Sequence, residues 1–364
     1  MIKYIDLGIS SKEYEEEISP LIKKIFLTGQ FISDSYVKEF ENKFKNYCNT
    51  KYAIALNSGT DALIFALMSL EISQDDEVIT VSNSFIATAN AISYLKANPV
   101  FVDINDNLLI DYNKIEELIT PKTKAIIPVH LMGAVCDMDE INKIAKKHKL
   151  FVIEDAAQSI GSTYKGIKTG SLSDIACFSL HPLKNLSGIT DGGIITTNNK
   201  QLASYIKKIR NHGLKNRDSQ EFIGRVSRLN SINAAILSHR FNKLDNIIEN
   251  RIKRAHLYNN LLEKIKEVKT IEMKDSIKHT YHTYVIKTGK REQLQDFLLN
   301  KGIETKIHYP ISIHNQKPFS HINNQHLIKT KRFEKSILTL PIANITFDEV
   351  RYICKCINEF YKGL

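Results

Sequence analysis

The first two-thirds of the chain alternate short apolar runs with longer stretches in which apolar and polar residues are mixed. The short runs are apolar throughout rather than at every second position, which is typical of strands covered on both faces of a sheet. Helical stretches separate most of these runs, and this alternation predicts an α/β fold with a mostly parallel, seven-stranded sheet. The seven expected strands are residues 51–56, 77–82, 99–104, 124–130, 150–155, 174–180 and 192–198.

The pattern changes near residue 235, where a long charged helical stretch begins. The segments after it include both helices and strands, and they predict a smaller α+β domain. Because 364 residues are many for one compact core, we expect a large domain over residues 1–240 and a small C-terminal domain over residues 241–364. The expected elements of the second part are a linking helix at 234–267, strands at 279–288 and 303–310, and helices at 290–303 and 347–364.

The formal net charge is +10. Lysines are scattered and form no dense arm, so we expect mainly a solvated basic surface, and we interpret the basic clusters at 206–210 and 250–256 as solvated helix faces. An anionic ligand such as a nucleotide sugar is the alternative explanation of the charge. We find no signature of nucleic-acid binding and expect no nucleic-acid partner.

No apolar run approaches the roughly 20 residues that span a bilayer. Residues 1–17 carry acids early and have no apolar core of a signal peptide. We therefore expect a cytoplasmic protein with no membrane partner. The histidines show no metal-ligand spacing, so no catalytic metal is expected. The odd number of cysteines argues against structural disulfides, and we expect free thiols at Cys48, Cys136, Cys177, Cys354 and Cys356.

Candidate ligand-binding residues follow the first two strands, because open α/β sheets bind ligands at the carboxyl ends of their strands. Ser58, Gly59 and Thr60 occupy a strand-to-helix turn, where free amide groups suit a phosphate. A simple helix cap is the alternative for these residues. Phe85 follows the second strand and could stack on a flat ring, although packing in the core is the commoner role of phenylalanine.

An acid and a lysine complete the candidate site. Glu154 and Asp155 close the fifth strand, and Gln158 follows shortly after. A buried acid is costly without a cationic partner, whereas a helix cap would explain Asp155 equally well. Lys184 has apolar and small neighbours, and a partly desolvated lysine has a lowered pKa and attacks carbonyls. A phosphate site, a ring platform, an acid and a lysine together describe a pyridoxal phosphate site.

The sequence as a whole resembles the DegT/StrS-type sugar aminotransferases. These are pyridoxal-phosphate enzymes of fold type I, the aspartate aminotransferase fold. The resemblance spans nearly the whole chain, and the combination of motifs is specific. The motifs are "LTGQFI" (27–32), "NSGTDAL" (57–63), "IPVHLMG" (127–133), "VIEDAAQSIGSTYKG" (152–166), "FSLHPLKNL" (178–186), "DGGIITTN" (191–198), "SRLNSINAAIL" (227–237) and "IHYP" (307–310).

The resemblance implies a role for each candidate residue. Lys184 matches the lysine that holds pyridoxal 5'-phosphate as a Schiff base and then moves a proton between cofactor and substrate carbons. Asp155 matches the acid that keeps the ring nitrogen protonated, and Gln158 matches the residue beside the ring hydroxyl. The other implied cofactor contacts are the phosphate cradle of Ser58, Gly59, Thr60 and Ser179 and the stacking position at Phe85.

The resemblance also implies a reaction and its partners. Glutamate, or glutamine, gives its amine to the cofactor, and a keto-sugar on a nucleoside diphosphate receives it. His181 matches a residue close to the lysine, and His308 with Tyr309 matches a segment beside the substrate. "KNLSGITDGG" (184–193) favours a 3-keto-6-deoxyhexose on dTDP, destined for polysaccharide, lipopolysaccharide or a glycosylated metabolite. A 4-keto-sugar or another keto substrate such as a cyclitol is the alternative.

Family members are homodimers with active sites at the interface, so a homodimer is expected. A non-catalytic regulator of the same fold is the alternative from another class, but it would require a basic helix-turn-helix module or the loss of Lys184. The chain departs from the family at three positions. Asp34 and Thr190 replace glycines, and Val226 replaces an asparagine that reaches the neighbour's cofactor phosphate. That contact is then lost or passes to Arg225, Arg228 or Asn230.

Overall fold

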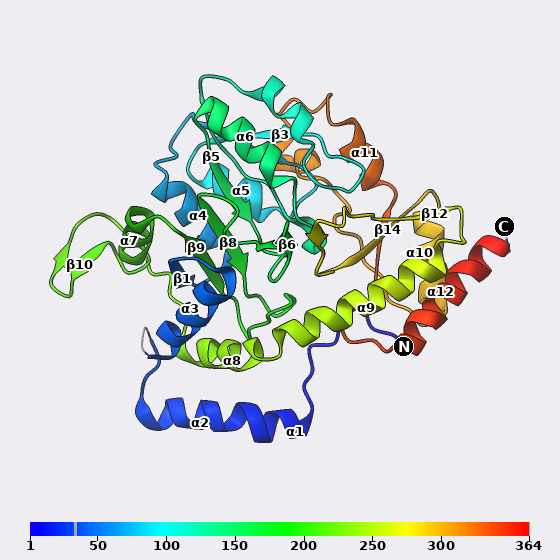
Figure 1. The fold of residues 1–364 in the computed structure, drawn as a ribbon, viewed down its shortest axis with the longest axis horizontal. Helices are drawn as coiled ribbons and strands as arrows, with labels where there is room; N and C mark the ends of the chain where they lie inside the picture. Colours follow the sequence, from blue (N-terminus) through cyan, green and yellow to red (C-terminus); the bar gives the residue numbers. More distant parts are fainter. Residues whose placement is uncertain (33–34, 364) are drawn as a thin grey trace.

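The computed structural model describes residues 1–32 and 35–363, and its centre is one seven-stranded sheet in the order β1-β9-β8-β5-β4-β2-β3 (Figure 1). Strand β9 runs antiparallel to both of its neighbours, whereas the other pairs are parallel. The predicted mostly parallel sheet is therefore confirmed. Its strands are β1 (Tyr52–Leu56), β2 (Glu77–Val81), β3 (Asn98–Val102), β4 (Thr123–Ile126), β5 (Phe151–Asp155), β8 (Ile175–Ser179) and β9 (Gly193–Thr197).

Helices cover both faces of this sheet, which explains why its strands are apolar throughout. In β1, Ile54 and Leu56 belong to one buried cluster, whereas Ala53 and Ala55 belong to another on the opposite face. Successive side chains of a strand point to opposite faces, so both sets must be apolar. One face packs on α4 (Gly59–Ser69), α5 (Ala87–Tyr94) and α7 (Lys200–Ile209), and the other on α3 (Ser35–Cys48), α6 (Met138–His148) and α8 (Ser231–Phe241).

The expected linking helix at 234–267 is two helices, α8 and α9 (Leu244–Leu262). Between them, the amides of Asn242 and Lys243 donate to carbonyls three residues earlier, which tightens the backbone into a turn. The turn lets the start of α9 pack on the large sheet through Ile248, while Tyr258 packs in the core of the small domain. Packing at both ends therefore divides a segment that looks continuous in the sequence.

The small domain contains a three-stranded antiparallel sheet in the order β12-β14-β15. The expected strand at 279–288 forms only over its second half. The expected strand at 303–310 is wrong, because within the described chain this segment makes only the isolated bridges Ile2–Ile303 and Lys306–Thr339 and then enters the cavity described below. The elements are β12 (Val268–Thr270), β14 (Tyr284–Thr288), β15 (Ile337–Leu340), α10 (Arg291–Asn300), α11 (Ile328–Glu334) and α12 (Phe347–Lys362).

The N-terminal arm lies against the small domain (Figure 1). The Ile2 amide donates to Gly302, and the Tyr4 amide donates to the Glu304 carboxylate at 3.1 Å. The arm then continues into α1 (Ser11–Glu13), a π-helix (Tyr14–Ile18) and α2 (Ser19–Thr28), of which α2 packs on α8. The domain boundary near residue 240 stays a prediction.

Several short elements join the main ones. The β10–β11 hairpin projects from the body of the large domain (Figure 1). All five cysteines are buried free thiols. Over the described ranges, no helix combines the length and apolar character that a membrane crossing requires. The short strands are β6 (Thr163–Tyr164), β7 (Ile167–Lys168), β10 (Leu214–Asn216), β11 (Ser219–Gln220) and β13 (Ile277–Lys278), and the 3-10 turns are Tyr112–Lys114, Glu116–Leu118, Leu131–Gly133, Ile313–Asn315 and Lys317–Phe319.

Candidate active site

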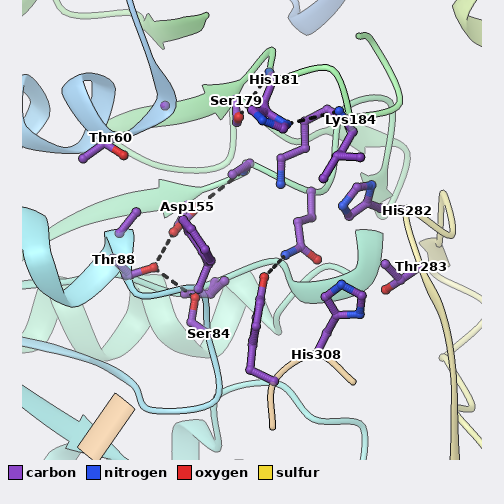
Figure 2. Close-up of a pocket in the computed structure, with 18 of the residues that line it drawn as sticks. Thr60, Ser84, Thr88, Asp155, Ser179, His181, Lys184, His282, Thr283 and His308 are labelled. Atoms are coloured by element: carbon purple, nitrogen blue, oxygen red, sulfur yellow. Dashed lines mark hydrogen bonds between the residues drawn. The ribbon is translucent and has the colours of Figure 1, made fainter. Parts of the chain in front are cut away.

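A cavity of about 460 Å³ lies at the carboxyl ends of β1, β2, β5 and β8 (Figure 2). This is the position at which an open α/β sheet is expected to bind a ligand. The structure brings all of the predicted site residues together in its lining, whereas their individual roles stay predictions. These residues are Ser58, Gly59, Thr60, Phe85, Asp155, Gln158, Ser179, His181, Lys184, His308 and Tyr309.

Lys184 extends from a tight turn after β8 into this cavity (Figure 2). Its amide donates to the carbonyl of His181 at 2.9 Å, and the Leu183 amide donates to Nδ1 of His181 at 3.2 Å. His181 thus holds the turn that aims the lysine. Burial lowers the pKa of Lys184 to about 8, although the Asp155 carboxylate opposes that shift. The amine is therefore neutral far more often near pH 8 than an exposed lysine is.

Asp155 ends β5 with its carboxylate buried in the cavity wall. The Thr88 hydroxyl donates to Oδ2 at 2.8 Å, and the Ala157 amide donates to Oδ1 at 3.2 Å. Burial raises the pKa of Asp155 in spite of these hydrogen bonds. The Ser84 hydroxyl lies 3.0 Å from the Thr88 hydroxyl and extends this hydrogen-bonded network around Asp155. Ser84 and Thr88 were missed in the sequence, although hydroxyls four residues apart after a strand are a usable signal.

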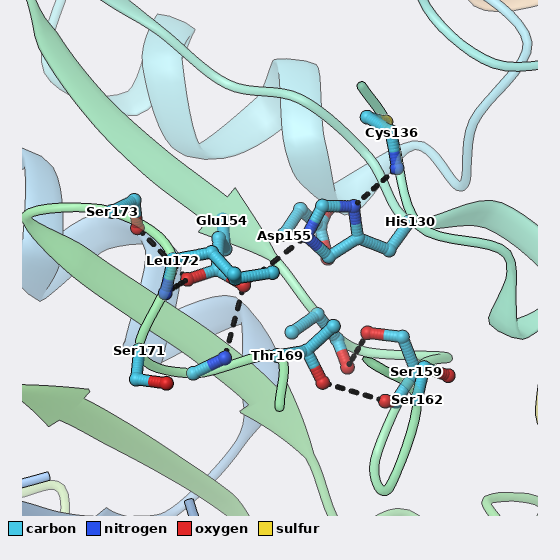
Figure 3. A network of polar contacts seen from close by, with 12 residues as sticks. His130, Cys136, Glu154, Asp155, Ser159, Ser162, Thr169, Ser171, Leu172 and Ser173 are labelled. Carbon is cyan, nitrogen blue, oxygen red and sulfur yellow. Dashed lines mark hydrogen bonds and ion pairs between the residues drawn. The ribbon is translucent and has the colours of Figure 1, made fainter. Parts of the chain in front are cut away.

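A second buried network fixes the strand end from the opposite face (Figure 3). Glu154 accepts hydrogen bonds from His130 Nε2 at 3.2 Å, and His130 Nδ1 accepts one from the Cys136 amide at 3.3 Å. The backbone of Asp155 is paired at the same place, since its carbonyl accepts from the His130 amide at 3.0 Å. Glu154 also accepts from the Gly170 and Leu172 amides and the Ser173 hydroxyl. This acid has a structural role, whereas Asp155 faces the cavity.

The turn after β1 offers the N-terminus of α4 to the cavity. Ser58 caps the helix, since its hydroxyl accepts from the Asp61 amide at 3.0 Å. The capping alternative is thus correct for this hydroxyl, which still leaves the first helix amides free to bind an anion. Gly59 packs so close to β8 that an added Cβ would lie 2.9 Å from Cβ of Ser179. Thr60 and Ser179 contribute further hydroxyls to the lining.

Gln158 and Tyr309 connect the large and small domains across the cavity. Oε1 of Gln158 accepts from the Met132 amide at 2.8 Å, and Nε2 donates to the Tyr309 hydroxyl at 3.1 Å. Burial raises the pKa of Tyr309, so its phenol keeps its proton. Burial together with the charges of Lys184 and Lys306 lowers the pKa of His308 to about 4. His308 is therefore a neutral imidazole at physiological pH.

Phe85 lies at the rim of the cavity rather than in the core. Its side chain is 55% exposed, and its ring centroid lies 5.9 Å from that of Tyr309 at an interplanar angle of 44°. A phenylalanine with a core role would be buried, so this exposure argues against the core alternative. An exposed aromatic face at a cavity mouth is suited to stacking on a flat ring.

The cavity also contains residues that the sequence analysis missed. The interpretation of 250–256 as a solvated helix face is wrong for Arg251, which is only 5% exposed and lines the cavity. Its Nη1 donates to the carbonyls of Tyr281 and His282 at 3.2 and 3.0 Å, so hydrogen bonds hold the side chain inward. The other missed lining residues are Tyr4, Ile5, Leu63, Ser84, Ala87, Thr88, Val129, Ala157, Leu183, Asp191, His282, Thr283, Ile342 and Ala343.

Thr190 and Val226, two of the three positions that depart from the family pattern, are not among the residues that line this cavity. Val226 is 51% exposed and bridges to Asn211 in the β10–β11 region. The three residues that could take over its contact with the neighbouring subunit already have contacts within the chain. Arg225 donates to Tyr94, Arg228 donates to Asn211, and Asn230 caps α8. The Thr190 hydroxyl donates to the Asp191 carbonyl. Asp34 lies outside the described residues, and the neighbour contact expected near Val226 stays a prediction.

Comparisons with known proteins point to one family. The profile of the DegT/DnrJ/EryC1/StrS aminotransferase family matches residues 12–358. The chain is 39% identical over 364 residues to dTDP-3-amino-3,6-dideoxy-alpha-D-galactopyranose transaminase of Aneurinibacillus thermoaerophilus, over 99% of both chains. It is 38% identical over 367 residues to a protein of Geobacillus stearothermophilus named "Pleiotropic regulatory protein", again over 99% of both chains. The structure of S. venezuelae DesV superposes with a TM-score of 0.96 at 32% identity, over 99% of this chain and 98% of that one.

The residues of the cavity fit the cofactor of this family, pyridoxal phosphate. A lysine with a lowered pKa suits a bond to an aldehyde. A buried carboxylate suits a protonated ring nitrogen. Gly59 has no side chain at the point where α4 packs closely on β8, so the amides at the start of the helix stay open to a phosphate. The chain therefore belongs to the DegT/DnrJ/EryC1/StrS aminotransferase family and is a pyridoxal-phosphate-dependent aminotransferase.

Proposed function

We propose that this aminotransferase moves an amino group from glutamate to a keto-sugar carried on a nucleoside diphosphate, specifically a 3-keto-6-deoxyhexose on dTDP. The observation that carries the proposal is the placement of Lys184 and Asp155 in one cavity, where burial lowers the pKa of the lysine and raises the pKa of the acid. The dTDP-3-amino-sugar transaminase that is 39% identical supports the class of sugar. A 4-keto-sugar is the alternative acceptor.

The chain's own residues supply the proton transfer and the binding. When bound, pyridoxal phosphate supplies an aldehyde for the amine and a ring that withdraws electrons from the neighbouring carbon. Nζ of Lys184 would accept a proton from a carbon held beside it and return it to a second carbon on the other side of the exchanging nitrogen. The Asp155 carboxylate, oriented by Thr88 and Ala157, would pair with a protonated ring nitrogen of the cofactor. The amides at the start of α4 would hold the phosphate of the cofactor.

We also propose that the active form is a homodimer with its sites at the interface. Several apolar side chains near the lysine turn and the hairpin are exposed, including Leu183, Ile189 and Ile223 at 41, 45 and 89%. Exposed apolar surface around a functional cavity favours a protein partner. Light scattering after gel filtration should give twice the chain mass of 41.6 kDa. A monomer that retains full activity would contradict this proposal.

The function is tested first by visible absorbance. The protein is purified with pyridoxal phosphate, and its spectrum is recorded before and after addition of glutamate, alongside Lys184→Ala. The proposal predicts a visible band in the wild type that glutamate bleaches, and no bleaching in the variant. Incubation with dTDP-linked 3-keto- and 4-keto-6-deoxyhexoses, followed by mass and NMR analysis of the products, then identifies the aminated carbon.

Each negative result has a separate meaning. Amination of the 4-keto-sugar alone would assign the alternative acceptor. A visible band that no amino donor bleaches would exclude the transamination and favour a regulatory role, as the name of the relative from Geobacillus stearothermophilus suggests for that protein.

A further inference from the structure

One wall of the cavity carries polar groups without partners. Among the described residues, Nε of Arg251, Nδ1 of His282 and Oγ1 of Thr283 are buried and make no hydrogen bond. All three side chains line the cavity, and Figure 2 shows His282 and Thr283 on the side away from Thr60, with Lys184 between. Three adjacent unsatisfied groups are costly unless something binds them. This wall is therefore built for a polar ligand.

Arg251 gives the wall a positive charge that the chain does not neutralise. It projects from α9 and is 5% exposed. The hydrogen bonds of its Nη1 go only to backbone carbonyls. Burial lowers its pKa to about 10, and no carboxylate of the described chain offsets that burial. The guanidinium still carries its charge at neutral pH. A buried cation without an anion is unfavourable, so an anionic ligand would stabilise it.

His282 and Thr283 add neutral hydrogen-bonding groups beside this cation. Burial lowers the pKa of His282 well below its usual value, and the charges of Lys184, Arg251 and His308 lower it further. A neutral imidazole and a hydroxyl each offer one hydrogen to an acceptor. One fixed cation with two neutral donors matches the two oxygens of a carboxylate.

The position of the wall identifies which carboxylate it would bind. His282 is close enough to both Lys184 and Arg251 to be influenced by their charges. In an amino acid, the amine and the α-carboxylate share one carbon. The group that binds the carboxylate must therefore lie next to the group that exchanges the amine. The phosphate of the cofactor is expected elsewhere, at the start of α4.

We propose that Arg251, together with His282 and Thr283, binds the α-carboxylate of the amino-acid donor. This inference rests on the aminotransferase function proposed above. The competing explanation is that Arg251 only secures the backbone at Tyr281 and His282. Arg254 provides a matched control, because it lies one turn further on α9, donates to the carbonyls of Ile342 and Ala343 at 3.3 and 2.8 Å, and also has an unpartnered Nε. Its side chain does not line the cavity.

The test compares two reagents that capture the cofactor's aldehyde and bleach the visible band. Aminooxyacetate carries a carboxylate, whereas O-methylhydroxylamine does not. Arg251→Gln should slow the reaction with aminooxyacetate at least about 30-fold and the reaction with O-methylhydroxylamine less than about threefold, because a lost charge-assisted contact is worth factors of this size. Thr283→Val should lower the ratio of the rate with aminooxyacetate to the rate with O-methylhydroxylamine about three- to tenfold. Arg254→Gln should leave the ratio unchanged.

The outcomes separate this inference from the proposed function. A wild-type ratio in Arg251→Gln would overturn the carboxylate subsite while leaving the aminotransferase assignment intact. An equal fall in Arg254→Gln would show that loss of backbone anchoring is the cause and would also overturn it. Absence of the visible band in the wild type would instead contradict the proposed function. If Arg251→Gln does not fold, Thr283→Val decides, and an unchanged ratio in that variant would reject the inference.

Discussion

The Thr88 hydroxyl donates a hydrogen bond of 2.8 Å to Oδ2 of Asp155 inside the cavity that also contains Lys184. Because hydrogen bonds to the ionised form lower the pKa of a carboxyl, this bond opposes the effect of burial, which raises the pKa of Asp155. Thr88 thus helps to keep Asp155 ionised, and an ionised acid is what a protonated ring nitrogen requires.

Thr88→Val should weaken binding of pyridoxal phosphate about tenfold. The substitution keeps the shape of the buried side chain but removes the donor to Asp155, and a hydrogen bond to a charged group is worth roughly 1.5–3 kcal/mol. Titration of the cofactor-free protein, followed by visible absorbance, measures the affinity. Thr88→Ser retains a hydroxyl and should bind almost as the wild type does. Equal affinity of Thr88→Val and wild type would show that the bond does not support Asp155.

Asp155→Asn should stabilise the cofactor-free protein while lowering its activity with glutamate at least about a hundredfold. Since the pKa of Asp155 is raised by burial, the folded state binds more protons than the unfolded state above the unfolded pKa of about 3.9. Stability is therefore lost as the pH rises from the unfolded pKa through the raised pKa of the folded state. The neutral amide in Asp155→Asn removes this cost of burying a charge.

Differential scanning calorimetry at two pH values tests this sign. We expect the melting temperature of Asp155→Asn to exceed that of the wild type by a few degrees at pH 7, and the difference to shrink towards pH 4. The exposed Asp218 serves as the control, because Asp218→Asn removes a charge without relieving burial. A variant that melts below the wild type at pH 7 would mean that the carboxylate is stabilising in this site.

The sheet could be predicted because its signal is local. Each strand is apolar on both faces, as Ala53 and Ile54 illustrate by packing in different clusters. The break between α8 and α9 could not be predicted in the same way, because it depends on where Ile248 and Tyr258 pack. The segment at 303–310 also has a strand-like composition, but contacts of His308 and Tyr309 with the cavity decide its course.

The same distinction explains which site residues the sequence identified. Ser58 follows a predicted strand and Asp155 ends one, so the rule for strand ends places them together. Lys184 was identified by its apolar and small neighbours, and the family motifs added Ser179, His181, His308 and Tyr309. Arg251 and Thr283 come from segments whose position depends on how the small domain packs on the large one. Nothing in the local sequence of "NRIKRAH" (250–256) distinguishes the inward arginine from its exposed neighbour Lys253.

Capture of pyridoxal phosphate by the cofactor-free protein should depend on pH through Lys184. Burial lowers the pKa of this amine to about 8, and only the neutral amine attacks an aldehyde. The capture rate should rise about tenfold per pH unit below pH 8 and level off above it. Stopped-flow absorbance between pH 6 and 10 measures the profile. A rate that keeps rising towards pH 10.5 would show that the environment of Lys184 does not lower its pKa.

Gly59→Ala tests the close contact between the start of α4 and the end of β8. An added Cβ would lie 2.9 Å from Cβ and 3.2 Å from Cα of Ser179, so the helix N-terminus must move away from the strand. Overpacking of this kind costs about 1–3 kcal/mol of stability. Because the displaced amides can no longer hold a phosphate in place, affinity for pyridoxal phosphate should fall at least about tenfold.

Two measurements separate the effect on binding from the effect on stability. Affinity for pyridoxal, which lacks the phosphate, should change much less than affinity for pyridoxal phosphate if the phosphate contact is what the methyl group disrupts. Gly289→Ala is the matched control, because an added Cβ there meets nothing within 4 Å, and it should leave both affinities unchanged. An equal loss for the two ligands would instead mean that Gly59 serves the packing of α4 on β8 and that the phosphate is held elsewhere.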